Sequence, residues 1–113
     1  METGQKNRVS RHTAEGFRVM AEYDGWKVGM LRYNERFSHL KEMERHLLTD
    51  EVFVLLSGKA TLHTEYEALE MEQGSIYIVP AGVWHHIVVS EDANVLVVEN
   101  RDTSIENTQK KTL

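Results

Sequence analysis

Apolar and polar residues alternate along much of this chain in short runs. A period of two predicts β-strands, because successive side chains of a strand point to opposite faces of a sheet. The clearest runs cover residues 51–57, 60–64, 69–71, 75–79, 84–89 and 94–98. Glycine, the single proline and acidic residues separate these runs. Many short strands at close spacing predict an all-β sandwich or barrel.

The N-terminal part of the chain has a hairpin signal and then an ambiguous segment. Asp24-Gly25 separates the alternating segments 17–21 and 26–31. We expect a type I′ turn there, in which both central residues have positive φ. Residues 36–43 have apolar side chains at helical spacing but lead directly into a polar stretch, so an irregular loop that enters a strand is expected.

The two ends of the chain are polar and lack a hydrophobic period. Residues 1–16 are interpreted as a flexible N-terminal arm, and residues 101–113 as a frayed, polar C-terminal tail. The single folded domain is therefore expected to span residues 17–100. At 113 residues the chain has room for only a modest core, so association with a second copy would help to bury apolar surface.

Composition excludes several classes of function. The formal net charge is −5, which argues against nucleic acid or an anionic membrane as a partner. There is no cysteine, so disulfides, thiolate ligands and cysteine nucleophiles are excluded. The polar N-terminus does not have the pattern of a secretory signal, and no apolar run is long enough to cross a bilayer. We expect a soluble, cytoplasmic protein.

Metal-ligating residue types gather at two places along the chain. Glu44 and His46 share one face if their segment is a strand, Glu51 begins the next apolar run, and His85 begins the run 84–89. If these strands are neighbours in a barrel, three or four of these side chains converge. Imidazole and carboxylate ligands without sulfur suit a divalent transition metal such as Mn, Fe(II), Ni or Zn, and the sequence does not choose among these metals.

The spacing of these residues resembles the two motifs of the cupin superfamily. The first motif corresponds to His46, four residues, Glu51, six residues and Gly58, with Glu44 in place of its leading histidine. The second corresponds to Gly74, five residues, Pro80-Ala81-Gly82, two residues and His85. The resemblance implies a double-stranded β-helix, the cupin jelly-roll barrel, with a metal site in its mouth held by His46, Glu51, His85 and Glu44.

Two longer segments are similar to ureidoglycolate lyases, cupin enzymes that split ureidoglycolate into glyoxylate and urea. These segments are Glu44-Arg45-His46 followed by Thr49-Asp50-Glu51, and residues 82–86 followed by 97–101. The resemblance implies a lyase that releases urea from a small oxygen-rich carboxylic acid. A non-catalytic cupin that binds a small ligand, and a non-haem metal dioxygenase or isomerase, are alternatives.

The sequence leaves the roles of several residues around the predicted metal site open. Glu44 is a metal ligand, a catalytic acid or base, or a surface residue of an edge strand. Arg45 and Tyr77 are candidate substrate-binding residues, because arginine grips a carboxylate with two hydrogen bonds. His86 alternates to the opposite face from His85 and is expected at the surface or in a subunit contact. The outward side chains of 52–56 predict a homodimer that covers them.

Overall fold

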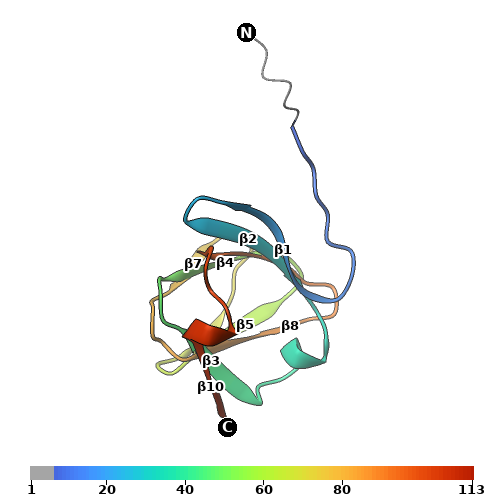
Figure 1. Cartoon of the computed structure of the whole chain (residues 1–113). Coiled ribbons are helices and arrows are strands. Elements are labelled where there is room, and N and C mark those ends of the chain that lie inside the picture. Colours follow the sequence, from blue (N-terminus) through green and yellow to red (C-terminus); the bar gives the residue numbers. More distant parts are fainter. Residues whose placement is uncertain (1–6) are drawn as a thin grey trace.

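The chain forms two antiparallel sheets that face each other around one core, as seen in a computed structural model that describes residues 7–113 (Figure 1). The first sheet has the order β1 (Gly16–Tyr23), β2 (Trp26–Arg32), β9 (Asn94–Asn100), β4 (Glu51–Ser57), β7 (Ile76–Val79). The second has the order β10 (Thr108–Thr112), β3 (Glu42–His46), β8 (His85–Val89), β5 (Ala60–Thr64), β6 (Ala68–Glu70). Two single-turn 3₁₀ helices complete the fold: η1 (Glu35–Phe37), η2 (Ile105–Asn107). These elements confirm the predicted all-β, jelly-roll architecture.

The core lies between the inner faces of the two sheets. Phe53 and Leu55 of β4 are buried, as are Val95 and Val97 of β9, which is its neighbour in the first sheet. The second sheet closes the core from the other side with three buried residues: Leu62, Ile87, Val89. Each of these residues is an inward member of an alternating run, so the period read from the sequence assigns the inner face of these strands correctly.

The predicted hairpin is present, but its turn differs from the expected type. β1 and β2 pair in antiparallel register up to Tyr23 opposite Trp26, which confirms the hairpin. Gly25 has φ of +89°, and among the described residues only glycines have positive φ. Asp24 therefore does not, and the type I′ prediction is wrong. A residue with a Cβ is strained in that region, whereas Gly25 enters it without cost.

The C-terminal segment is the main correction to the predicted fold. Residues 108–112, expected to be frayed, form β10 and pair with β3 from Thr108 opposite His46 to Thr112 opposite Glu42. The side chains of this edge strand are mostly exposed, so its sequence carries no apolar period. At the other end, residues 1–6 of the predicted arm lie outside the described residues. His12 is buried, and its Nε2 lies 2.7 Å from the Gly16 carbonyl oxygen.

The segment before β3 forms η1 and then an irregular loop. The loop that enters a strand confirms the prediction for residues 36–43, whereas the helical turn at Glu35–Phe37 was not predicted. η1 begins after Asn34, whose side chain accepts a hydrogen bond from the Phe37 amide. Phe37 is buried in the core, and this anchors the loop over the second sheet. No helix within residues 7–113 is long and apolar enough to cross a membrane.

Candidate metal centre

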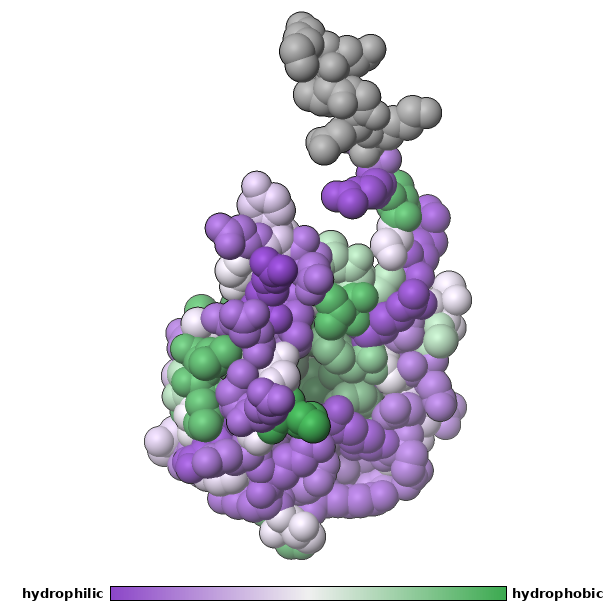
Figure 2. Space-filling model, viewed as in Figure 1, coloured by the Kyte–Doolittle hydropathy of each residue, from purple (hydrophilic) through white to green (hydrophobic). Residues whose placement is uncertain are grey.

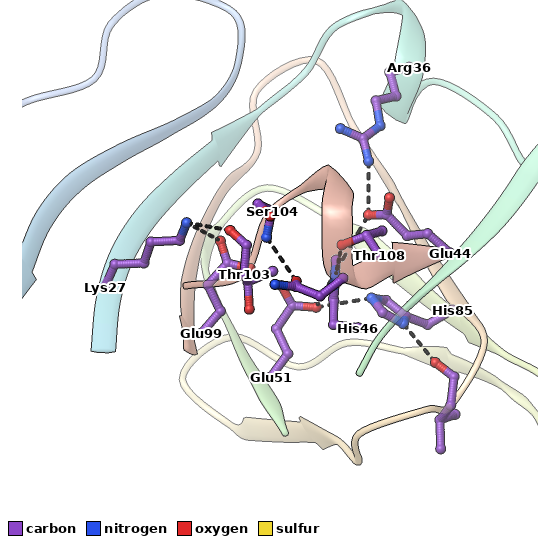
Figure 3. Close-up of polar contacts among 12 residues, drawn as sticks. Lys27, Arg36, Glu44, His46, Glu51, His85, Glu99, Thr103, Ser104 and Thr108 are labelled. Atoms are coloured by element: carbon purple, nitrogen blue, oxygen red, sulfur yellow. Dashed lines mark hydrogen bonds and ion pairs between the residues drawn. The ribbon is translucent and has the colours of Figure 1, made fainter. Parts of the chain in front are cut away.

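Three strands bring the predicted ligands together at one end of the barrel. Glu44 and His46 lie on the same face of β3, as the strand period requires. β3 pairs with β8 so that Glu44 is directly opposite His85. Glu51, the first residue of β4, reaches the same point from the facing sheet, and both it and His85 are buried. Segments that are distant in sequence thus share one small volume (Figure 3).

The side-chain atoms of this group lie close to one another. Glu51 Oε1 is 3.0 Å from His85 Nε2 and 3.3 Å from His46 Nε2. Glu44 Oε1 is 3.8 Å from His46 Nε2. The predicted convergence of Glu44, His46, Glu51 and His85 is therefore present in the structure.

The outer nitrogens of both imidazoles are held by the protein. His85 Nδ1 lies 3.0 Å from the Val83 carbonyl oxygen, and a carbonyl only accepts, so Nδ1 carries a proton. Nε2 of a neutral His85 then carries a lone pair that faces the Glu51 carboxylate. Two lone-pair groups at 3.0 Å require a positive charge between or beside them, which is either a second proton on the ring or a metal ion.

Thr108 orients the other ring, although its hydroxyl can donate or accept and so does not define which nitrogen of His46 carries the proton. Its Oγ1 lies 2.9 Å from His46 Nδ1, across the β3–β10 pair, and leaves Nε2 facing the carboxylates. Hydrogen bonds to the outer nitrogen fix the ring orientation of metal-ligating histidines. Thr108 therefore belongs to the site, although it lies in the segment that the sequence predicted to be frayed.

Glu99 is a further acidic residue of the site that the sequence reasoning missed. It follows Val95 and Val97 on the inward face of β9 and is only 9% exposed. One carboxylate oxygen of Glu99 lies within 4.8 Å of the nearest ligand atoms of His46 and Glu51. An acidic residue at an inward position of an apolar strand was the available signal, because buried carboxylates need a specific partner.

Burial and neighbouring charges shift the pKa of these groups in opposite directions. Burial raises the pKa of Glu99 to about 7, the adjacent Glu51 carboxylate adds to the rise, and Lys27 opposes it. Burial also acts to raise the pKa of Glu51, but hydrogen bonds with His46 and His85 outweigh it and lower this pKa to about 2. Desolvation acts to lower the pKa of His46, yet its bond to Glu51 makes the net change a rise. Glu51 is thus the stably ionised member of the group.

Two predicted substrate-binding residues do not line this site. Arg45 donates from Nε to Gln109 Oε1 at 2.7 Å, and its guanidinium lies 4.5 Å from the Trp84 ring centroid. The Tyr77 hydroxyl accepts a 2.8 Å hydrogen bond from the Glu72 amide. Neither residue lines the cavity beside the histidines. Arg45 lies outside the cavity because side chains alternate along a strand. Its neighbours Glu44 and His46 point inward, so Arg45 points to the opposite face.

Arg36 and His86 take positions that the sequence did not predict. Arg36 of η1 lines the cavity and donates from Nη2 to Glu44 Oε1 at 2.8 Å. His86, expected at the surface, is buried because η1 covers it. Its Nε2 donates to the Arg36 carbonyl oxygen at 3.0 Å, and its ring stacks on Phe37 with centroids 6.0 Å apart.

The site opens into a cavity of about 260 Å³. This lies just below the range of about 300–1,000 Å³ typical of drug-sized ligand pockets, so a ligand held here would be small. Apolar side chains from both sheets and from η1 form much of the wall: Phe17, Leu31, Phe37, Phe53, Ile87, Val97. Residues 103–105 lie over it from the C-terminal segment. Figure 2 shows a hollow beside η2, apolar in its depth and hydrophilic around much of its rim.

The donor set is suited to a divalent transition metal. Two groups of three side chains have ligand atoms within 4.8 Å of one another: Glu44, His46 and His85, and His46, Glu51 and Glu99. Two ligand atoms that bind the same metal at about 2.0–2.2 Å are separated from each other by a distance comparable to the separations between these side-chain atoms. The lone pair on Nε2 of a neutral His85 faces the Glu51 carboxylate, so a cation can bind both groups there. The residues present therefore fit a metal, and their chemistry does not select its identity.

The sequence profile of the cupin domain family matches residues 39–99, more than half of the chain. The chain belongs to the cupin family. This cupin is also 46% identical, over 52 residues, to an uncharacterised protein of Streptomyces coelicolor. That match covers 43% of this chain, and it spans about half (48%) of the length of the Streptomyces protein.

Solved structures of other proteins share the fold at low sequence identity. A cupin-2 domain protein of Shewanella frigidimarina has a TM-score of 0.62 at 23% identity, with 82% of this chain and 85% of that chain covered. A single-residue variant of Pac13, a Streptomyces nucleoside dehydratase, with uridine, has a TM-score of 0.73 at 14% identity, with 99% and 93% covered. A putative mannose-6-phosphate isomerase of Ralstonia eutropha has a TM-score of 0.61 at 21% identity, with 81% and 88% covered.

Proposed function

We propose that this cupin binds a divalent transition metal and acts on a small, oxygen-rich carboxylic acid. The observation that supports the metal most directly is the pair of histidines whose Nδ1 atoms are engaged by Thr108 and the Val83 carbonyl. Their Nε2 atoms are thereby aimed at the Glu51 carboxylate. Such outer-nitrogen hydrogen bonds are a regular feature of histidine metal sites.

The reaction that we propose is cleavage of ureidoglycolate into glyoxylate and urea. A bound divalent metal would supply Lewis-acid stabilisation of the substrate oxygens. A base of the protein takes the proton of the carbinol hydroxyl, the C–O bond becomes a carbonyl, and the C–N bond breaks. The departing urea nitrogen then receives a proton. Glu44 is the candidate for one of these transfers, since it lies at the cavity beside both His46 and Arg36.

The metal is tested by elemental analysis of protein purified without a metal-affinity tag. We expect about one equivalent of Mn, Fe, Ni or Zn per chain, and less than about a tenth of an equivalent in His46→Ala and His85→Ala. His63→Ala is the matched control, because His63 lies outside the cavity. Parent protein that is free of metal, and takes up none when supplied, would refute the metal proposal.

The lyase is tested by urea release from ureidoglycolate. We expect the parent protein to turn over and Glu44→Gln to lose about 100-fold or more of the rate, as is typical for removal of a general acid or base. Glu42→Gln is the control, because Glu42 is on the same strand but outside the cavity. No turnover by the metal-loaded parent removes the lyase, and unchanged turnover in Glu44→Gln removes Glu44 from the mechanism.

A second candidate is a cupin that binds a small ligand without a metal. A second proton on His85 satisfies Glu51 as well as a metal does, which permits this function. The uridine-bound neighbour Pac13 has the same fold over nearly the whole chain. Metal-free protein that binds uridine, and in which His46→Ala abolishes that binding, would favour this candidate over the first.

We also propose that the cupin is a homodimer. Ile76 and Ile78 of β7 are 68% and 60% exposed, and they lie opposite Val54 and Val52 of β4 on the outer face of the first sheet. Neighbouring apolar side chains on a sheet face form the kind of patch that a second copy covers. Sedimentation should give a dimer for the parent and a monomer for Ile78→Lys. Leu113→Lys, an exposed apolar residue near the chain end, is the control.

A further inference from the structure

Arg36 is the arginine that lines the cavity, and most of its hydrogen-bonding capacity is unused. Its guanidinium lies 5.0 Å from the Phe37 ring centroid, and Nη2 donates to Glu44. A guanidinium has five N–H donors, and within residues 7–113 the Glu44 contact is the side-chain hydrogen bond that Arg36 makes. The side chain is 40% exposed, so it stands at the opening of the cavity rather than in its depth.

The charges that line the cavity favour an anionic ligand once a metal is bound. Three basic side chains, Lys27, Arg36 and Lys110, balance three acidic ones, Glu44, Glu51 and Glu99. A divalent cation therefore gives the lining a net positive charge, and such a cleft concentrates anions.

The basic side chains are not equally available to a ligand. Lys27 Nζ donates to the Thr103 carbonyl oxygen at 2.8 Å and lies 4.0 Å from Glu99, so it is already engaged. Arg36 and Lys110 are instead associated with Glu44. Arg36 pairs with Glu44 directly, and Lys110 is opposite Glu44 in the β3–β10 register. The available positive charge is therefore at the Glu44 end of the cavity.

We infer that Arg36 holds the carboxylate of a small 2-hydroxy acid at the cavity opening, with the hydroxyl end directed at His46 and His85. This inference names the substrate-binding residue for the proposed function, and it rests on that function for the chemistry at the histidines. A guanidinium can grip a carboxylate with two parallel hydrogen bonds, which Lys110 cannot do. Glu44 now occupies one donor of Arg36, so ligand binding and the release of Glu44 toward His46 are coupled.

The probe for this inference is glycolate, with the uncharged amide glycolamide as its isosteric partner. Binding is measured by calorimetry or ligand-observed NMR on metal-free and Mn²⁺-loaded protein. We expect Arg36→Gln to weaken glycolate binding by about 10- to 100-fold, the usual worth of a hydrogen bond to a charged group. Arg36→Lys should keep part of the affinity. Arg45→Gln, which removes an arginine held outside the cavity by Gln109, should stay within about twofold of the parent.

Glu44→Gln gives an independent check in metal-free protein. It frees Arg36 from its ion pair, so glycolate should bind more tightly than to the parent, while glycolamide binding should not change. Circular dichroism confirms that each variant is folded.

The inference is overturned if Arg36→Gln keeps the glycolate affinity of the parent, or if Arg45→Gln loses as much. Equal binding of glycolate and sulfate would show an unspecific anion site, and parent protein that binds no glycolate would also overturn it. Failure to bind metal would refute the proposed function instead, because the metal-free titrations still compare Arg36 with Arg45.

Discussion

Replacement of Glu99 by glutamine should change how the stability of the metal-free protein depends on pH. Burial and the Glu51 carboxylate raise the pKa of Glu99 to about 7, against an ordinary value of 4.5. Below pH 4.5 the group is protonated in both folded and unfolded chains and has no effect. Between pH 4.5 and 7 the unfolded chain ionises first, so the folded state loses stability as the pH rises. Above pH 7 the loss is complete and constant.

The size of this loss follows from the two pKa values. A difference from 4.5 to about 7, at about 1.4 kcal/mol for each pKa unit, gives an upper value of about 3 kcal/mol. The Glu99 carboxyl lines an open cavity, so solvent screening reduces the penalty. We therefore expect about 1–2 kcal/mol. Glutamine keeps the shape of the side chain and cannot ionise, so the variant should not show this loss.

The measurement is urea denaturation of chelator-treated protein, followed by tryptophan fluorescence at pH 5 and pH 8. The free energy of unfolding of Glu99→Gln, relative to the parent, should rise by about 1–2 kcal/mol between the two pH values. This comparison cancels any constant packing effect of the amide. Glu91→Gln, in an exposed turn, is the control and should show no change with pH. An equal difference between Glu99→Gln and the parent at both pH values would refute the reasoning.

Three further substitutions test other contacts. Thr108→Val should weaken metal binding by about 10- to 100-fold in a chelator competition assay while Thr108→Ser retains it, and equal affinities would show that the threonine does not orient the ring. Gly58→Ala should lower the free energy of unfolding by about 2 kcal/mol or more, as measured by denaturant titration. Gly58 has φ of +77°, and a Cβ added there would lie 2.6 Å from Ala93 Cα. Leu62→Ala in the core should lower the free energy of unfolding by about 2–5 kcal/mol. Leu48→Ala at the surface is the control and should lower it by less than about 0.5 kcal/mol. Similar melting temperatures for the two variants would contradict the packing described.

The sequence predicted those strands whose two faces differ in polarity. β4 and β9 alternate buried and less buried residues, so their limits were close to those observed. β10 escaped prediction because an edge strand with mostly exposed side chains has no such contrast. Its pairing with β3 depends on a long-range register that no local pattern records.

The site was predictable where spacing within a motif determines position. His46, Glu51 and His85 converge because strand period and turn length fix where each side chain points. Arg36 was missed because η1 and an irregular loop place it, and neither has a period. Glu99 was missed because it belongs to an apolar run whose other inward members are core residues. Arg45 does not line the cavity, since proximity in sequence to a ligand does not put a side chain on the same face of a strand.

The contribution of the C-terminal segment to the site has a practical consequence for protein engineering. The residues that the family profile recognises stop at Glu99, whereas part of the cavity lining and the hydroxyl beside His46 come from residues 103–108. A recombination junction near Asn100 would therefore exchange this part of the cavity lining while leaving both histidine-bearing motifs and Arg36 intact. Libraries of alternative endings could be screened on one constant scaffold, and a fragment trimmed to the recognised domain would be a poor surrogate for the intact protein.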